Sequence, residues 1–224
     1  MIVLDTFGKE IDEERLLSRL PGDSADMYED DVDDLLEQIR EEDVLHPAAA
    51  YTSVELTGAE TDQIQAEGAV MTSSVFTGKC KAGDVVYPCL VTVGRQLDQF
   101  AQDLDDPMLS YLQRLLMNLC LDDALLAVAQ QIAEQHPGKK LLMVKPGVDS
   151  VCEFSEQSVL LKWLGDATDK LGVAVSDRGF LTPGYSSTAL LFVADEPSNY
   201  CQDWQNESQR AALLADLNKI AGHI

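Results

Sequence analysis

Positive charge is scarce in this chain. Its 224 residues include 16 Lys and Arg against 39 Asp and Glu, which gives a net charge of −23. A nucleic-acid-binding protein needs a basic surface to neutralise phosphates, and docking on an anionic lipid surface needs one too. We therefore expect neither nucleic acid nor a membrane as a partner. A small molecule, or a protein with a basic or neutral face, fits this charge better.

Long apolar runs are also missing. An unbroken run such as residues 189–194 falls far short of the roughly 20 residues that span a bilayer. The N-terminus meets an acidic residue at Asp5 and has no cationic segment before an apolar stretch, so it does not indicate a signal peptide. We expect a cytoplasmic protein.

Histidine and cysteine are few, which leaves little material for catalysis or metal binding. There are three His and five Cys, with no Cys-x-x-Cys and no His near a Cys at the spacing of zinc ligands. The glycine-rich nucleotide loops, the Gly-x-Ser-x-Gly elbow and His-Glu-x-x-His are absent as well. We assign no catalytic residue and no metal site. His136 is expected to cap a helix C-terminus, and Cys201, in a polar segment, is the one cysteine not expected in the core.

What the chain does have is an acidic front end. The first fifty residues hold 16 acidic and 4 basic residues, about half of the net charge. Crowded Asp residues are typical of calcium loops, but an EF-hand loop needs Gly at its sixth position, where this chain offers Tyr28 or Asp31. We predict a solvated acidic helix within residues 26–43. Its buried side would consist of apolar residues at helical spacing: Val32, Leu35, Leu36 and Ile39.

The rest of the chain alternates between strand-like and helix-like segments without regular β-α-β spacing. We expect strands at residues 50–56, 85–93, 141–144, 172–175 and 189–194. We expect helices at residues 73–80, 95–104, 106–136, 155–164 and 205–220, the longest beginning at the Asp106 cap and Pro107 and ending at His136-Pro137-Gly138. This order predicts an α+β fold with a twisted antiparallel or mixed sheet and flanking helices. Residues 1–50 would form an acidic helical segment packed on the same domain as residues 51–224.

Two adjacent carboxylates, Asp122 and Asp123, interrupt the apolar face of the longest predicted helix. Buried together, they would raise one another's pKa and could take part in acid–base chemistry. On a polar shoulder facing solvent they would need no special role. The solvent-facing arrangement is our expectation.

Two Pro-Gly turns stand out as a candidate ligand site. One follows a predicted strand at residues 145–147, and the other precedes a strand within residues 181–188. Pro-Gly favours a type II turn, which exposes backbone donors and acceptors, here beside hydroxyl groups. Two ordinary turns would have the same composition. The candidate ligand-binding residues are Lys145, Pro146, Gly147, Pro183, Tyr185, Ser186 and Thr188.

From about residue 54 to residue 195, the order of motifs resembles the activation domain of cobalamin-dependent methionine synthase, especially its short stand-alone relatives. The motifs that carry the resemblance are Val91-Thr92-Val93-Gly94, the long helix after it, Lys145-Pro146-Gly147, Glu156-Gln157, Leu171-Gly172-Val173-Ala174-Val175 and Leu181-x-Pro183-x-Tyr185-Ser186-x-Thr188-Ala189. The resemblance implies an α+β fold and S-adenosylmethionine as ligand, in a shallow groove near the Pro-Gly turns. It also implies that cobalamin is carried by a partner, a corrinoid-binding protein or methyltransferase. If the chain is an enzyme, the resemblance implies a methyltransferase-related activity that works only with that partner.

The chain departs from the family pattern at the ligand turns. Where the family has an Arg before the first turn and a Tyr after it, this chain has Met143 and Val148. An Arg can bind a ligand carboxylate with two parallel hydrogen bonds, and Met cannot; Lys145 can supply a charge from a neighbouring position, with poorer geometry. A second hypothesis follows: a non-catalytic interaction module that kept the fold, lost the S-adenosylmethionine site and uses its acidic helix to meet a basic partner.

Overall fold

A computed structural model describes residues 1–5, 11, 13–20, 27–104, 106–148, 151–194 and 202–203. The predicted helix at residues 205–220 and Cys201 lie outside these residues. The described strands pair only in antiparallel fashion, which confirms the α+β prediction.

The main sheet has seven strands. Along its path the order is β1 (Ile2–Leu4), β2 (Ala48–Tyr51), β7 (Val85–Thr92), β11 (Ser186–Ala194), β8 (Lys140–Val144) and β12 (Gln202–Asp203), and β3 (Val54–Glu55) also pairs with β7. The domain boundary expected at residue 50 falls inside β2.

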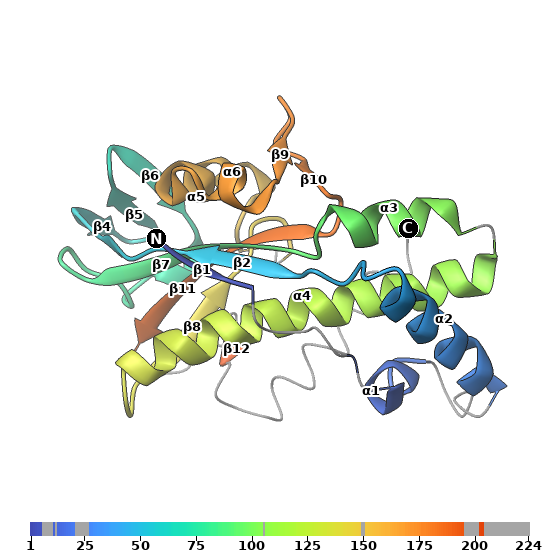
Figure 1. Ribbon diagram of the computed structural model, residues 1–224. Coiled ribbons are helices and arrows are strands. Elements are labelled where there is room, and N and C mark those ends of the chain that lie inside the picture. The colour runs from blue at the N-terminus through green and yellow to red at the C-terminus, as the bar shows by residue number, and fades with distance from the viewer. Residues whose placement is uncertain are drawn as a thin grey trace.

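Side chains alternate between the two faces of this sheet, and each face is covered by helices (Figure 1). On one face, Cys89, Met143 and Leu191 pack against α4 (Pro107–Gln135). On the other face, Val144 and Leu190 pack towards α5 (Gln157–Leu164), which is followed by α6 (Ala167–Leu171). The central strands of the sheet are therefore buried on both sides, whereas the edge strand β1 is largely exposed.

The long helix α4 begins as its sequence predicts. The Asp106 carboxylate accepts hydrogen bonds from the backbone N–H groups of Met108 (2.7 Å) and Leu109 (3.1 Å), and Pro107 occupies the first turn. Among the described helices only α4 is long and apolar enough to cross a membrane by length and composition, and 61% of its most apolar window is buried in the protein. Its packing is that of a core helix.

Three helices surround the N-terminal half of α4: α1 (Glu13–Leu17), α2 (Glu29–Glu41) and α3 (Arg95–Asp103) (Figure 1). The predicted acidic helix is confirmed in α2, since its four apolar residues are 0–3% exposed and join the cluster around α4. Most of its carboxylates lie on the exposed side.

Several expectations need correction where segments are short. The strand expected at residues 50–56 is divided into β2 and β3, the helix at residues 73–80 is a single 3-10 turn, η2 (Ser74–Phe76), and the strand at residues 172–175 is reduced to β9 (Ala174–Val175). The helix expected at residues 155–164 begins with a 3-10 turn, η3 (Phe154–Glu156), before α5. A meander of β4 (Gly58–Glu60), β5 (Gln63–Ala66) and β6 (Ala69–Thr72), the strand β10 (Leu181–Thr182) paired with β9, and the elements β1, α1 and α6 were not predicted.

Candidate functional site

The first Pro-Gly turn lies beside the first residues of β11, the strand that the second Pro-Gly segment precedes. Strands β8 and β11 are antiparallel, with Val144 opposite Leu190, so the chain leaves β8 at Lys145 next to the point where β11 begins. Continuing this register places Pro146 beside Thr188. The first turn is held by hydrogen bonds from the Gly147 N–H to the Cys152 carbonyl (3.0 Å) and from the Val148 N–H to the Lys145 carbonyl (3.4 Å).

A polar network fixes the second turn against α5. The Thr188 hydroxyl donates to Gln157 Oε1 (3.2 Å), and Gln157 Nε2 donates to the Gly179 carbonyl. Farther along, the Ser186 hydroxyl donates to Thr92 Oγ1 (2.9 Å). Thr188 and Gln157 are buried, whereas Ser186 is half-buried and reaches the edge of the site. The network therefore positions the start of β11 and leaves few polar groups for a ligand.

An exposed aromatic pair lies over the first turn. The rings of Phe154 and Phe180 are 5.5 Å apart between centroids, and these residues are 39% and 61% exposed. A Cβ atom at Gly147 would lie 3.1 Å from the Phe154 ring, and one at Gly179 would lie 3.7 Å from it, so the ring covers both glycines. Exposed large apolar groups that gather at one place indicate a contact surface. Neither Phe was predicted from the sequence. The available signal was position: Phe180 directly follows Gly179, and Phe154 lies just before the helix that begins at Glu156-Gln157.

Lys145 points away from this surface. It is 6% exposed, and its charge lowers the pKa of Asp122 and of Cys89, which lie on the α4 side of the sheet. Burial has a larger effect and raises the pKa of the Cys89 thiol to about 12. The candidate site residues are thus divided, with the Lys145 ammonium towards α4 and the Thr188 hydroxyl towards α5. Side chains alternate between the two faces along a strand, so Lys145, two residues after Met143, lies on the same face of the sheet as Met143.

Asp122 does not face solvent as expected. It is 7% exposed, and its Oδ2 lies 3.2 Å from Arg19 Nη2. Burial raises its pKa, while Lys145 and Arg19 act to lower it. The expectation that Asp122 faces solvent is wrong because α1 and the turn after it cover this part of α4. The neighbouring Asp123 binds Arg15 through two hydrogen bonds (2.7 and 3.0 Å) at the surface.

The positions that depart from the family pattern are also placed. Met143 is 1% exposed and belongs to the core against α4, whereas Val148 is 36% exposed beside the first turn. Tyr185 is half-buried against α3 and α4, and burial raises its pKa. Pro183, after a cis peptide bond, is buried, and Gly184, unlike Gly147, has no positive φ, so the type II turn expected there is wrong. None of these side chains supplies a cation at the turn.

His136 follows the last turn of α4, as expected of a capping residue. Its backbone N–H donates to the Ala133 carbonyl (3.0 Å), and its ring lies 2.6 Å from the Tyr87 hydroxyl through Nε2. Within the residues that the structure describes, no three His, Cys, Asp or Glu side chains gather as a metal-binding group.

Comparison with known proteins identifies the architecture. No family model matches the chain, and no curated protein matches it. Among solved structures, the crystal structure of the MetH reactivation domain bound to AdoHcy is similar over 98% of this chain and 89% of that chain, with a TM-score of 0.60 and 15% sequence identity. This chain, with its antiparallel sheet and long helix, therefore has the fold of the MetH reactivation domain.

Proposed function

We propose that this protein binds S-adenosylmethionine, or S-adenosylhomocysteine, at the Pro-Gly turns and assists the reductive reactivation of a corrinoid carried by a partner. The proposal is supported by the position of the turn at residues 145–148, which follows β8 next to the start of β11 in this fold. The similar MetH domain was crystallised with AdoHcy.

The chain's own groups define how such a ligand would be held. Phe154 and Phe180, whose rings are tilted by 34° to one another, offer exposed aromatic faces on which the adenine could stack. The exposed backbone of Gly147 and the half-buried Ser186 hydroxyl offer polar contacts at the edge. Met143, at the position where an Arg is expected, is buried in the core and supplies no guanidinium fork to the turn. We therefore expect weak binding, driven more by stacking than by recognition of the ligand carboxylate.

On the partner, the corrinoid would accept one electron from a reductant and then the methyl group of S-adenosylmethionine. The remainder of that ligand would be released as S-adenosylhomocysteine. The role of this chain would be to hold the sulfonium and its methyl group at the site surface, where a partner can approach. An exposed aromatic surface suits that role better than a closed cavity would, because the methyl acceptor belongs to another protein.

Calorimetry tests the ligand half of the proposal. We expect both S-adenosyl compounds to bind at one site and to bind several-fold more weakly to Phe154→Ala, because one stacking face is lost. Val70→Ala, which truncates an exposed apolar side chain on β6, is the matched control and should bind normally. Absence of heat at millimolar ligand would refute S-adenosyl binding by this chain.

A spectroscopic assay tests the partner half. The probe is the cobalamin-carrying fragment of a methionine synthase in its cob(II)alamin form, with S-adenosylmethionine and titanium(III) citrate as the reductant. The visible absorbance reports the methylated product. We expect the intact chain to accelerate its formation and Phe154→Ala to do so less; equal rates with and without the chain would contradict the role in reactivation.

The second candidate function is the interaction module, which two observations favour. Met143 occupies the position where an Arg would bind the ligand carboxylate, and it is buried. Helix α2 presents a row of exposed carboxylates: Glu29, Asp30, Asp33, Asp34, Glu37 and Glu41. A row of like charges steers a basic partner at low salt and loses effect as salt screens it. Pull-down at low and high salt, with and without S-adenosylmethionine, separates the candidates: capture that depends on salt and ignores the ligand favours the module.

A further inference from the structure

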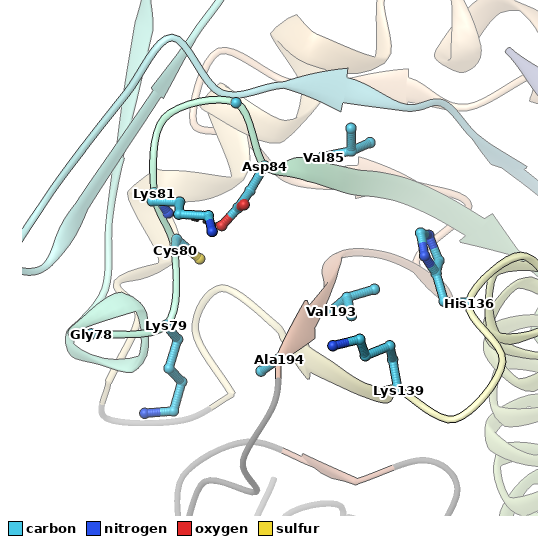
Figure 2. A pocket seen from close by; sticks show the side chains of 11 residues that line it. Gly78, Lys79, Cys80, Lys81, Asp84, Val85, His136, Lys139, Val193 and Ala194 are labelled. Carbon is cyan, nitrogen blue, oxygen red and sulfur yellow. Dashed lines mark hydrogen bonds between the residues drawn. The ribbon is translucent and has the colours of Figure 1, made fainter.

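A cavity lies at the other end of β11. It has a volume of about 500 Å³, and its walls come from the loop before β7, the end of α4 and the last residues of β11 (Figure 2). The residues that line it are Gly78, Lys79, Cys80, Lys81, Gly83, Asp84, Val85, His136, Lys139, Val193 and Ala194. Because Thr188 and Ala194 lie at opposite ends of one strand, this cavity is separate from the Pro-Gly turns.

The lining is basic, in contrast to the rest of the chain. Acidic residues outnumber basic ones by 39 to 16 overall, yet three of the chain's nine lysines line this cavity, against the single carboxylate of Asp84. That carboxylate already accepts a hydrogen bond from the Lys81 backbone N–H (2.9 Å). Among the residues that the structure describes, neither Lys79 nor Lys81 forms an ion pair with an acidic side chain. Positive charge is therefore concentrated here and is not neutralised by the loop.

The loop leaves side chains, rather than backbone amides, to contact a ligand. The N–H groups of Lys79, Gly83 and Asp84 donate to the carbonyls of Phe76 (2.9 Å), Leu56 (2.8 Å) and Lys81 (3.1 Å). An anion in the cavity would meet ammonium groups, which are mobile point charges. Such groups recognise charge more than shape, and phosphate carries high charge in small volume.

Among the described residues that line the cavity, the others carry no carboxylate. The half-buried Cys80 thiol stays protonated, because burial raises its pKa to about 12. The His136 ring is fixed at one wall by the Tyr87 hydroxyl. Val85 and Val193 provide an apolar side, as Figure 2 shows. Lys79 and Lys81 on the loop, across from Val193, fit a ligand with a phosphorylated end and a less polar body.

We propose that this cavity binds a phosphorylated small molecule of nucleotide size, with Lys79 and Lys81 beside its phosphate groups. The volume lies within the range of about 300–1,000 Å³ that is usual for small-molecule sites. The site stands apart from the proposed S-adenosyl site, so either can fail without the other.

Calorimetry with inorganic pyrophosphate and with ADP, each at about 50 and 300 mM salt, tests this site. Lys79→Gln/Lys81→Gln removes two charges from the cavity, and Lys162→Gln/Lys170→Gln removes two from exposed positions on α5 and α6 as the matched control. Melting temperatures of all variants establish that they are folded.

We expect one site that binds ADP more tightly than pyrophosphate, because ADP also fills the apolar side. The cavity variant should bind ADP about tenfold more weakly, since each ion pair with an exposed lysine contributes modestly, and the control should bind it normally. Three results would overturn the proposal: no binding of either probe at millimolar concentration and low salt, equal losses in the two double variants, or equal affinity for ADP and pyrophosphate.

Discussion

Replacing Arg19 by Met should destabilise the protein in a way that depends on pH. Arg19 lies beside the buried Asp122 carboxylate, and both side chains of the pair are only about a tenth exposed (10% and 9%). Burial already raises the pKa of Asp122, while the Arg19 charge and hydrogen bond act against that rise. Without Arg19, the ionised carboxylate keeps the cost of burial and loses one of its two cations, so its pKa rises further.

The size of the effect follows from the geometry. Two unit charges separated by the 3.2 Å between Nη2 and Oδ2 attract by about 5 kcal/mol at an effective dielectric constant of about 20. Part of that attraction is offset, because the guanidinium no longer has to be desolvated. We expect a net loss of roughly 3 kcal/mol in the free energy of unfolding at pH 7, or a fall in Tm of about 6–12 °C for a chain of this length.

The direction of the pH dependence can be worked out from Asp122. Its folded-state pKa is raised, so its favourable contribution is complete below the unfolded-state value and is lost as pH rises through the folded-state value. In Arg19→Met the folded-state pKa of Asp122 rises further, so ionisation of this carboxyl lowers the free energy of unfolding by a larger amount. The difference between wild type and variant should therefore be greatest at neutral pH and shrink as the solution is made acidic and Asp122 becomes protonated.

Urea unfolding between about pH 4 and pH 8 measures this difference. Arg15→Met is the matched control, because its pair with Asp123 is at the surface, with side-chain exposures of 45% and 18%, and should contribute at most about 1 kcal/mol. Equal losses in the two variants, or an Arg19→Met loss that does not change with pH, would show that the reasoning about the buried charge is wrong.

Three further predictions concern single positions. Gly94→Ala should lower the stability by roughly 2–4 kcal/mol by urea unfolding, because Gly94 has a φ of +87° and a Cβ there would lie 2.8 Å from the His46 carbonyl oxygen; a loss below about 0.5 kcal/mol would contradict this. Cys80 should react with iodoacetamide at pH 8 about a thousandfold more slowly than an ordinary thiol, because its pKa is raised to about 12, and peptide mass spectrometry of the native and the urea-unfolded chain measures this. Trp163→Phe should cost about 1–3 kcal/mol in thermal unfolding, since the buried indole N–H donates to the Ala66 carbonyl (2.9 Å); an unchanged Tm would show that this hydrogen bond contributes little.

Periodic segments with clear end signals were predictable from the sequence. The start of α4 at Asp106 and Pro107 and the buried side of α2 follow from local chemistry alone, because capping and helical spacing are properties of neighbouring residues. The position of the first Pro-Gly turn beside β11 could be expected only through the resemblance to a known fold, since it depends on which strands pair.

Features that depend on distant neighbours could not be predicted. Asp122 reads as a surface residue until α1, a helix of five residues, is known to cover it. Whether Lys145 faces α4 or α5 depends on the register of β8 against β11, which a one-residue slip would reverse. The aromatic pair of Phe154 and Phe180 forms across 26 residues of chain. Such contacts are products of tertiary packing.

Strand β11 has a practical consequence for both proposed sites. Its residues 190–192 are paired with β7 on one side and β8 on the other and are covered by helices on both faces, so their amides should exchange with solvent only when the whole protein unfolds. The Pro-Gly turns lie at its first residues and the lysine-lined cavity at its last. A ligand at either end is therefore anchored to the part of the molecule that opens last. Its binding should appear as a rise in the melting temperature of the entire chain, which makes a thermal-shift screen a direct way to search for both ligands.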